Sequence, residues 1–197
     1  MTIKIGEIIM RSILNRSAKG KMPGTEPPRR IAIIGSGGSG KSAVARQLGA
    51  ILGTEVIHLD ALFWKPGWVE TPRPEWRALQ EALVLRETWI MDGNYRGTIA
   101  IRLAAADTIL FLDLPRAVCL WRVLGRWLRH RGTARPELAP GCPERLDWAF
   151  LRWIWKYPHN NRPALMHLLN DHAQSKAVVI LRTPSQVRRF LREIALS

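Results

Sequence analysis

The sequence predicts an α/β fold in which a parallel sheet of about five strands has helices on both faces and a small lid. Five short apolar runs of strand length alternate with segments whose apolar residues recur at helical spacing. A glycine-rich turn joins the first run to the first helical segment. Such alternation is typical of βαβ units, in which consecutive strands lie parallel and the connecting helices cover the sheet.

Length and composition favour one folded domain. The chain has 197 residues, of which 47% are hydrophobic, and this is enough for one sizeable core with inserted lids. We assign that domain to residues 30–197. Residues 1–29 are basic and proline-rich, so we expect a mobile arm, or a stretch that precedes the true start of the protein.

The charge balance favours a polyanionic ligand. Thirty basic residues against sixteen acidic ones give a net charge of +14, which suits nucleotide phosphates or nucleic acid and does not choose between them. Cys119 and Cys142 are too few for a disulfide framework or a metal cluster, so we interpret them as packing residues. Unpaired cysteines suit a reducing compartment, so we expect a cytoplasmic protein. No run approaches the roughly 20 apolar residues of a membrane span.

The first strand, residues 31–34, ends in a phosphate-binding pattern. Gly35, Gly40, Lys41 and Ser42 fill G-x-x-x-x-G-K-[ST], and a helix is predicted over residues 42–52. Glycine allows several backbone N–H groups to turn toward one anion. We therefore expect ATP phosphates to bind the following residues: Gly35, Ser36, Gly37, Gly38, Ser39, Gly40, Lys41, Ser42 and Ala43. The alternative is a flexible glycine-serine turn.

Two side chains of this pattern have expected roles in ATP chemistry. Lys41, interpreted as a solvent-side charge on the loop, would reach the β- and γ-phosphates, and the Ser42 hydroxyl would hold Mg²⁺.

The second strand, residues 55–59, ends in Asp60 and is followed by a loop rich in tryptophan and proline. Ligands of open α/β sheets lie beyond the carboxyl ends of the strands, so we place the phosphoryl acceptor at Asp60. The alternative is an aspartate that caps a helix. Trp64, Trp68 and Trp76 are better explained by packing than by base stacking.

A helix over residues 74–86 precedes the third strand, residues 88–91, which runs into Asp92. A carboxylate that ends a buried strand beside a phosphate loop can hold Mg²⁺, and Asp92 is our first choice. Asp113, after the strand at residues 108–112, matches the pattern equally well. Sheet topology has to decide between them.

Residues 115–130 form the second informative stretch. Arg122, Arg126 and Arg129 have the spacing that places them on one helical face. The planar, permanently charged guanidinium is suited to a transferring phosphoryl group, and a solvated basic face is the alternative.

The rest of the chain completes the alternation. Residues 131–145 predict a loop or lid, and residues 146–155 and 164–169 predict helices separated by a break at 160–163. A last strand at residues 177–181 precedes a helix at 186–196.

With these motifs in place, the chain resembles adenylate-kinase-like P-loop proteins. The segment Asp92-Gly93-x-x-Arg96 is similar to the D-G-F-P-R segment of nucleoside monophosphate kinases, and Arg122 and Arg126 fall where those kinases carry lid arginines. A closer resemblance is to the bacterial DNA topology modulation proteins, the FlaR-related group. It is carried by the blocks HLDALFWKPGW, DGNYRGT, FLDLPRAVCLWRVLGR and GCPERLDWAFLRWIW, within roughly residues 30–190.

The resemblance implies a strand order of 2-3-1-4-5, an ATP site and an effect on DNA supercoiling, and it supplies no acceptor. A monophosphate kinase should also present an arginine-bearing helix after the second strand, where this chain has Asp60 and its tryptophan-rich loop. An aspartate there resembles small-molecule kinases, in which it holds or deprotonates a substrate hydroxyl.

We therefore interpret the chain as a phosphotransferase that uses Mg²⁺ and ATP. Asp92 would position the metal, Arg122, Arg126 and Arg162 would neutralise charge, and Asp60, Arg96 or Arg162 would face a small-molecule or nucleotide acceptor. Weak non-specific nucleic-acid binding would follow from the charge, and no membrane partner is expected. The alternatives are a DNA-binding regulatory ATPase and a nucleotide-binding module without turnover.

Overall fold

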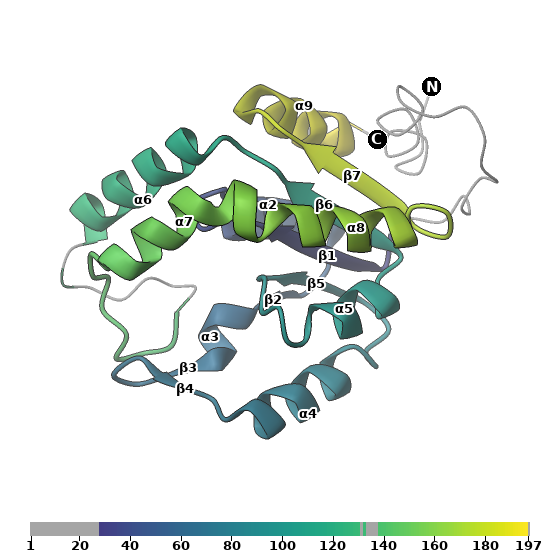
Figure 1. Cartoon of the computed structure of the whole chain (residues 1–197). Helices are drawn as coiled ribbons and strands as arrows, with labels where there is room; N and C mark the ends of the chain where they lie inside the picture. The colour runs from purple at the N-terminus through teal and green to yellow at the C-terminus, as the bar shows by residue number, and fades with distance from the viewer. Residues whose placement is uncertain (1–27, 131, 133–137, 197) are drawn as a thin grey trace.

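The computed structural model of the chain describes residues 28–130, 132 and 138–196. Most of the predicted basic arm, residues 1–27, and part of the predicted lid, residues 131 and 133–137, therefore lie outside the described residues. Within the described part, five parallel strands form the central sheet (Figure 1). They are β1 (Arg30–Gly35), β2 (Val56–His58), β5 (Trp89–Asp92), β6 (Thr108–Leu112) and β7 (Ala177–Leu181).

The sheet has the predicted topology. Its strand order is β2-β5-β1-β6-β7, which is the expected order 2-3-1-4-5 when only these five strands are numbered. β1 lies in the centre and pairs in parallel with β5 on one side and β6 on the other. The carboxyl ends of β5 and β6 therefore both lie beside the loop that follows β1.

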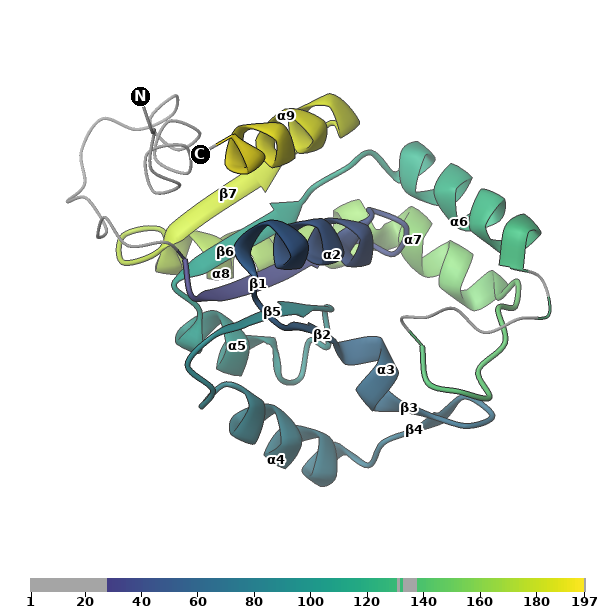
Figure 2. The same cartoon turned by 180° about the vertical axis from the view of Figure 1, so that it is seen from behind.

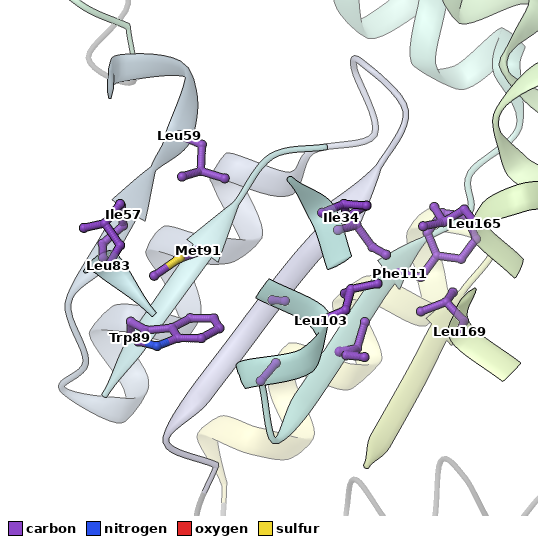
Figure 3. Packing of buried hydrophobic residues seen from close by; sticks show 14 of the residues in the cluster. Ile34, Ile57, Leu59, Leu83, Trp89, Met91, Leu103, Phe111, Leu165 and Leu169 are labelled. Atoms are coloured by element: carbon purple, nitrogen blue, oxygen red, sulfur yellow. The ribbon is translucent and has the colours of Figure 1, made fainter. Parts of the chain in front are cut away.

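Helices cover both faces of the sheet, as Figures 1 and 2 show from opposite sides. One face packs against α2 (Lys41–Leu52) and α9 (Pro184–Ala195), and the other against α4 (Arg73–Leu83), α5 (Ile99–Ala105) and α8 (Arg162–His172). Alternation along β1 explains this arrangement, because Ile31 and Ile33 point to the first core and Ala32 and Ile34 to the second. Figure 3 shows the second core, where Trp89, Phe111 and Leu165 are buried.

The elements around the site lie beyond the carboxyl ends of the strands (Figure 1). Helices α6 (Arg116–His130) and α7 (Trp148–Asn160) pack together on one side, and α3 (Leu59–Phe63) leads into a hairpin on the other. The hairpin pairs β3 (Trp64–Lys65) with β4 (Val69–Glu70). Helices α3 and α5 and this hairpin were not predicted from the sequence.

The packing roles predicted for the tryptophans and cysteines are confirmed. Trp76 is buried in the second core, and Trp64 and Trp68 pack around a small cluster that contains Cys142. Cys119 and Cys142 are both buried free thiols. No helix in the described ranges is both long and apolar enough to cross a bilayer.

Several helix boundaries differ from the prediction, most clearly those of α7 and α8. Helix α7 begins only at Trp148, because the Asp147 carboxylate caps it by accepting hydrogen bonds from the backbone N–H groups of Ala149 and Phe150. It then continues through Pro158 to Asn160, and α8 begins at Arg162. The expected break at residues 160–163 is therefore a single residue, Asn161. The buried Ile154 and Tyr157 anchor the last turns of α7 despite the proline.

Candidate active site

The glycine-rich loop connects β1 to the N-terminus of α2, as predicted. Gly38 has a φ of +75°, and a Cβ built on it would lie 2.3 Å from the backbone oxygen of Cys119 in α6. Any larger residue would therefore clash with α6 as well as strain the backbone. The first turn of α2 carries no acidic residue, so its free N–H groups and partial positive charge are available to a phosphate.

Lys41 lies against the loop, and its description as a solvent-side charge was wrong. It is the first residue of α2, is partly buried, and its Nζ donates hydrogen bonds of 3.0 Å to the backbone oxygens of both Gly35 and Ser36. Burial lowers the pKa of Lys41, and the nearby carboxylates of Asp60 and Asp92 oppose that shift. Those two carbonyls hold the ammonium at the position of the phosphate cradle.

Asp92, Ser42 and His58 form a hydrogen-bonded group at the carboxyl edge of the sheet. The Ser42 hydroxyl donates to Asp92 Oδ2 at 2.6 Å, and His58 Nδ1 lies 2.7 Å from Asp92 Oδ1. The Asp92 side chain is only 4% exposed. Strand register explains the histidine, because His58 and Asp92 are direct partners of β2 and β5. His58 was not predicted as a site residue, although it lies in the second predicted strand, two residues before Asp60.

Asp113, the alternative metal carboxylate, has other partners. Its strand β6 also neighbours β1, so topology alone does not separate it from Asp92. The Asp113 carboxylate instead accepts from Arg162 Nε at 2.8 and 3.0 Å and from Arg162 Nη2 at 2.9 Å, and Arg182 Nε lies 3.5 Å away. Two donors of the Arg162 fork, Nε and Nη2, are therefore occupied by this chain's own carboxylate. The roles expected for Arg162 in charge neutralisation and acceptor binding stay predictions.

The three arginines of α6 have different environments. Arg122 Nη1 donates to the backbone oxygen of Ser39 at 2.9 Å and so contacts the phosphate loop. Arg126 Nε donates to the buried Glu144 at 2.9 Å, and Arg126 lines the cleft in front of the loop. Arg129 Nε donates to the carbonyl of Gly125 within its own helix. The basic face thus brings two of its three arginines to the site.

The segment after Asp92 is fixed from both sides. Asn94 clamps Gly35, since its Oδ1 accepts from the Gly35 N–H at 3.0 Å and its Nδ2 donates to the Gly35 oxygen at 2.7 Å. Behind it, the fully buried Arg102 donates to the carbonyls of Gly93 at 3.0 Å and Asn94 at 2.7 Å, and also to the side chain of Gln80. Burial lowers the pKa of Arg102 to about 10. Sequence reasoning found neither contact.

Asp60 lies at the mouth of the site and does not cap α3. It is the second residue of that helix and is exposed, and His58 occupies the cap position. The Tyr95 hydroxyl donates to Asp60 Oδ1 at 2.6 Å. Burial and the adjacent Asp60 raise the pKa of Tyr95, so this hydroxyl stays protonated and remains a donor. One oxygen of Asp60 is thereby held in a fixed position.

A cleft of about 550 Å³ connects the phosphate loop with Asp60 and Arg126. Gly37 and Lys41 of the phosphate loop line it together with Asp60 and Arg126. Five aromatic side chains form much of its wall: Trp64, Trp68, Tyr95, Phe150 and Trp153. Of the residues predicted for the site, the cleft therefore joins Gly37 and Lys41 with Asp60 and Arg126. Ser42, Asp92 and Arg122 do not line it and lie beside the loop through their hydrogen bonds. Arg96 lines a neighbouring pocket and Arg162 is paired with Asp113.

The groups at the loop suit a magnesium ion and a polyphosphate. Mg²⁺ prefers oxygen ligands and takes only one or two of them from the protein, and Ser42 and Asp92 present a hydroxyl and a carboxylate side by side. The glycines at positive φ and the free N-terminus of α2 present backbone donors to an anion.

Comparisons with known proteins place the chain among distant structural neighbours. No family model matches it, and no curated protein matches it. The resemblance to DNA topology modulation proteins therefore rests on its sequence blocks alone.

Solved structures match at low similarity. A gluconokinase from Sinorhizobium meliloti 1021 is 19% identical over 86% of this chain and 90% of its own, with a TM-score of 0.48. A shikimate kinase from Acinetobacter baumannii, in complex with shikimate, is 18% identical over 84% and 90%, with a TM-score of 0.48. A sugar kinase from Janibacter sp. HTCC2649 is 19% identical over 87% and 96%, with a TM-score of 0.44. Sequence identities and TM-scores this low say nothing about the activity of this chain.

Proposed function

We propose that this protein is a phosphotransferase that moves a phosphoryl group from Mg²⁺-ATP to a hydroxyl of a small molecule. The observation that carries the proposal is the 2.6 Å hydrogen bond between Ser42 of the phosphate loop and the buried Asp92. It brings the expected hydroxyl and carboxylate ligands of a metal together, and the residues next to them in the sequence, Lys41 and Gly93, line the cleft that also contains Asp60. A loop that only turned the chain would not need this pair.

The phosphate loop would bind the polyphosphate. Its backbone N–H groups and the N-terminus of α2 would contact the phosphate oxygens, and Lys41 would exchange its two carbonyl partners for them. Ser42 and Asp92 would hold Mg²⁺, which when bound neutralises phosphate charge and orients the transferring group.

Arg122 and Arg126 would supply further positive charge. Arg122 is fixed to the loop through the oxygen of Ser39, and Arg126 is held in the cleft by Glu144. A guanidinium that is already held in place loses little freedom when a phosphoryl oxygen approaches, which is the condition for electrostatic stabilisation of a transition state.

Asp60 would orient the acceptor hydroxyl and accept its proton. Its Oδ1 receives the Tyr95 hydroxyl, which leaves Oδ2 for a substrate. A hydroxyl acceptor fits this carboxylate better than a phosphate acceptor does, because like charges repel in the cleft. Asp60 lines the same cleft as Lys41, where the transferring group would lie.

The test combines binding and turnover. We predict that Lys41→Ala removes most of the affinity for Mg²⁺-ATP, measured by calorimetry, and leaves the thermal unfolding transition cooperative. The control is Lys156→Ala, which removes the same charge from an exposed position on α7. ADP release from wild type is then measured with a panel of hydroxyl compounds. Unchanged ATP affinity in folded Lys41→Ala protein would refute the phosphate site, and the absence of acceptor-dependent ADP release would refute the transfer activity.

A further inference from the structure

A second, smaller pocket of about 160 Å³ lies beside the cleft. Its walls come from the segment after β5, from α5, and from α7 and α8. Asn94 and Trp153 line both this pocket and the cleft, so the two cavities are neighbours with a shared wall. Nothing in the proposed phosphate chemistry uses it.

Arg96 gives the pocket an uncompensated positive charge. It is the single charged residue among the described residues that line the pocket. Its Nη1 donates to Asn161 Oδ1 at 3.1 Å, and no carboxylate in the described ranges pairs with it. Arg126 and Arg162, in contrast, are each paired with a carboxylate. A guanidinium left without a counter-ion beside apolar walls attracts an anion.

Asn161 adds a hydrogen-bond donor that lacks an acceptor. The residue is only 8% exposed, and its Nδ2 is buried without a hydrogen-bond partner among the described residues. The Arg96 contact fixes the amide orientation, since the oxygen must face the guanidinium. A buried N–H without an acceptor costs about 1–3 kcal/mol, and a ligand oxygen that reaches Nδ2 after a small shift of the side chain would remove that cost.

The remaining lining favours the same kind of ligand. Burial raises the pKa of Tyr157, and Asp113 adds to the rise, so its hydroxyl stays protonated as a donor. Ile99, Leu165 and Leu168 supply apolar surface, which suits the carbon part of a small organic anion. The polar groups offered by Arg96, Asn161 and Tyr157 are thus donors or able to donate.

We propose that this pocket binds an oxyanion, either a carboxylate or a phosphate group, that belongs to the acceptor. The acceptor would then be a small hydroxy compound with an acidic group. Tyr95, which holds Asp60, lines the cleft, and the next residue, Arg96, lines the pocket, so the carboxylate and the guanidinium belong to neighbouring cavities. We expect one small molecule to span both, with its hydroxyl at Asp60 and its anion at Arg96. The acceptor part of this inference rests on the proposed function, and the anion site itself does not.

Direct anion binding tests the pocket without any turnover. Inorganic phosphate and glycolate are titrated by calorimetry into Lys41→Ala protein, in which the phosphate loop no longer competes. We expect binding of one or both, and a loss of affinity of about tenfold or more when Arg96→Gln or Asn161→Asp is added, since each variant removes a donor to an anion. Arg152→Gln is the control, because it removes an exposed arginine charge next to Trp153. Thermal unfolding shows that each variant is folded.

The comparison of probes and variants decides the outcome. Tighter phosphate binding would identify a phosphorylated acceptor, and tighter glycolate binding a hydroxy acid. Failure of both anions to bind, or equal binding in the Arg96→Gln and Arg152→Gln proteins, overturns the site. In wild type, ADP release with neutral polyols but not with anionic hydroxy compounds overturns the acceptor class. If none of the compounds causes ADP release, while anion binding still depends on Arg96, the phosphotransferase is overturned and the anion site stands.

Discussion

Replacing Asp92 by asparagine should separate magnesium binding from folding. The Asp92 side chain is buried and has two partners, Ser42 Oγ at 2.6 Å and His58 Nδ1 at 2.7 Å. The amide in Asp92→Asn keeps one oxygen for Ser42 and turns its NH₂ toward His58, which can accept in one tautomer. We therefore expect a loss of only about 1–2 kcal/mol in the free energy of unfolding. In a protein of this size that lowers Tm by about 2–8 °C.

The stabilisation that Mg²⁺ adds in the presence of ATP should change much more than the stability of the free protein. A ligand at about 100 times its Kd stabilises the folded state by about 2.7 kcal/mol, which raises Tm by about 5–11 °C. Thermal unfolding is measured with ATP alone and with ATP and Mg²⁺. Asp92→Asn should lose the increment that Mg²⁺ adds in wild type, because an amide is a far weaker ligand for this cation than a carboxylate.

Asp113→Asn is the matched control for the same experiment. It removes a carboxylate at the end of the other strand beside β1, where it holds Arg162 and Arg182. Because both arginine side chains are about one third exposed, solvent screening limits the expected cost to about 1–2 kcal/mol. The Mg²⁺ increment should persist in this variant. An increment that survives in Asp92→Asn and disappears in Asp113→Asn would reverse our choice of metal carboxylate.

Two further predictions concern the cleft. Asp60→Asn should lower turnover by about 10²- to 10⁴-fold and spare ATP affinity, because the amide still accepts from Tyr95 and no longer accepts a proton. If the variant and wild type release ADP at equal rates, Asp60 takes no part in the chemistry. Arg126→Lys should slow single turnover at saturating ATP more than it weakens ATP binding, since lysine keeps the charge and loses the fork that contacts Glu144. Equal single-turnover rates in the variant and wild type would count against a catalytic role for Arg126.

The sheet could be predicted from the sequence because its strands are apolar on both faces. Residues 108–112 and 177–181 were assigned with the observed boundaries, since polar or turn-forming residues flank each run. Helix ends were less accurate because they depend on individual caps. Asp147 caps α7, which begins two residues after the predicted start, and no periodicity of apolar residues indicates that contact.

The site was harder to predict than the sheet, because the residues that contact one another there lie far apart in the sequence. Asp92 and Asp113 have the same local pattern, and contacts with residues distant in the sequence distinguish them, since Asp92 accepts from Ser42 and Asp113 accepts from Arg162. His58 reaches Asp92 through strand register, which fixes the partners of a short strand only in the folded sheet. A sequence pattern can thus indicate which residues end strands, but not which of them contact one another.

The buried Arg102 explains how one short segment can serve both cavities. Residues 93–96 have to turn sharply, because Asn94 clamps the phosphate loop while Tyr95, at a φ of +38°, reaches Asp60. Backbone carbonyls exposed by such a turn need donors, and Arg102 supplies them to Gly93 and Asn94 from the core side. A neutral donor would satisfy fewer acceptors, whereas the guanidinium fork contacts both carbonyls and Gln80 at once. The hydrophobic core thereby sets the position of groups that line the cleft and the anion pocket.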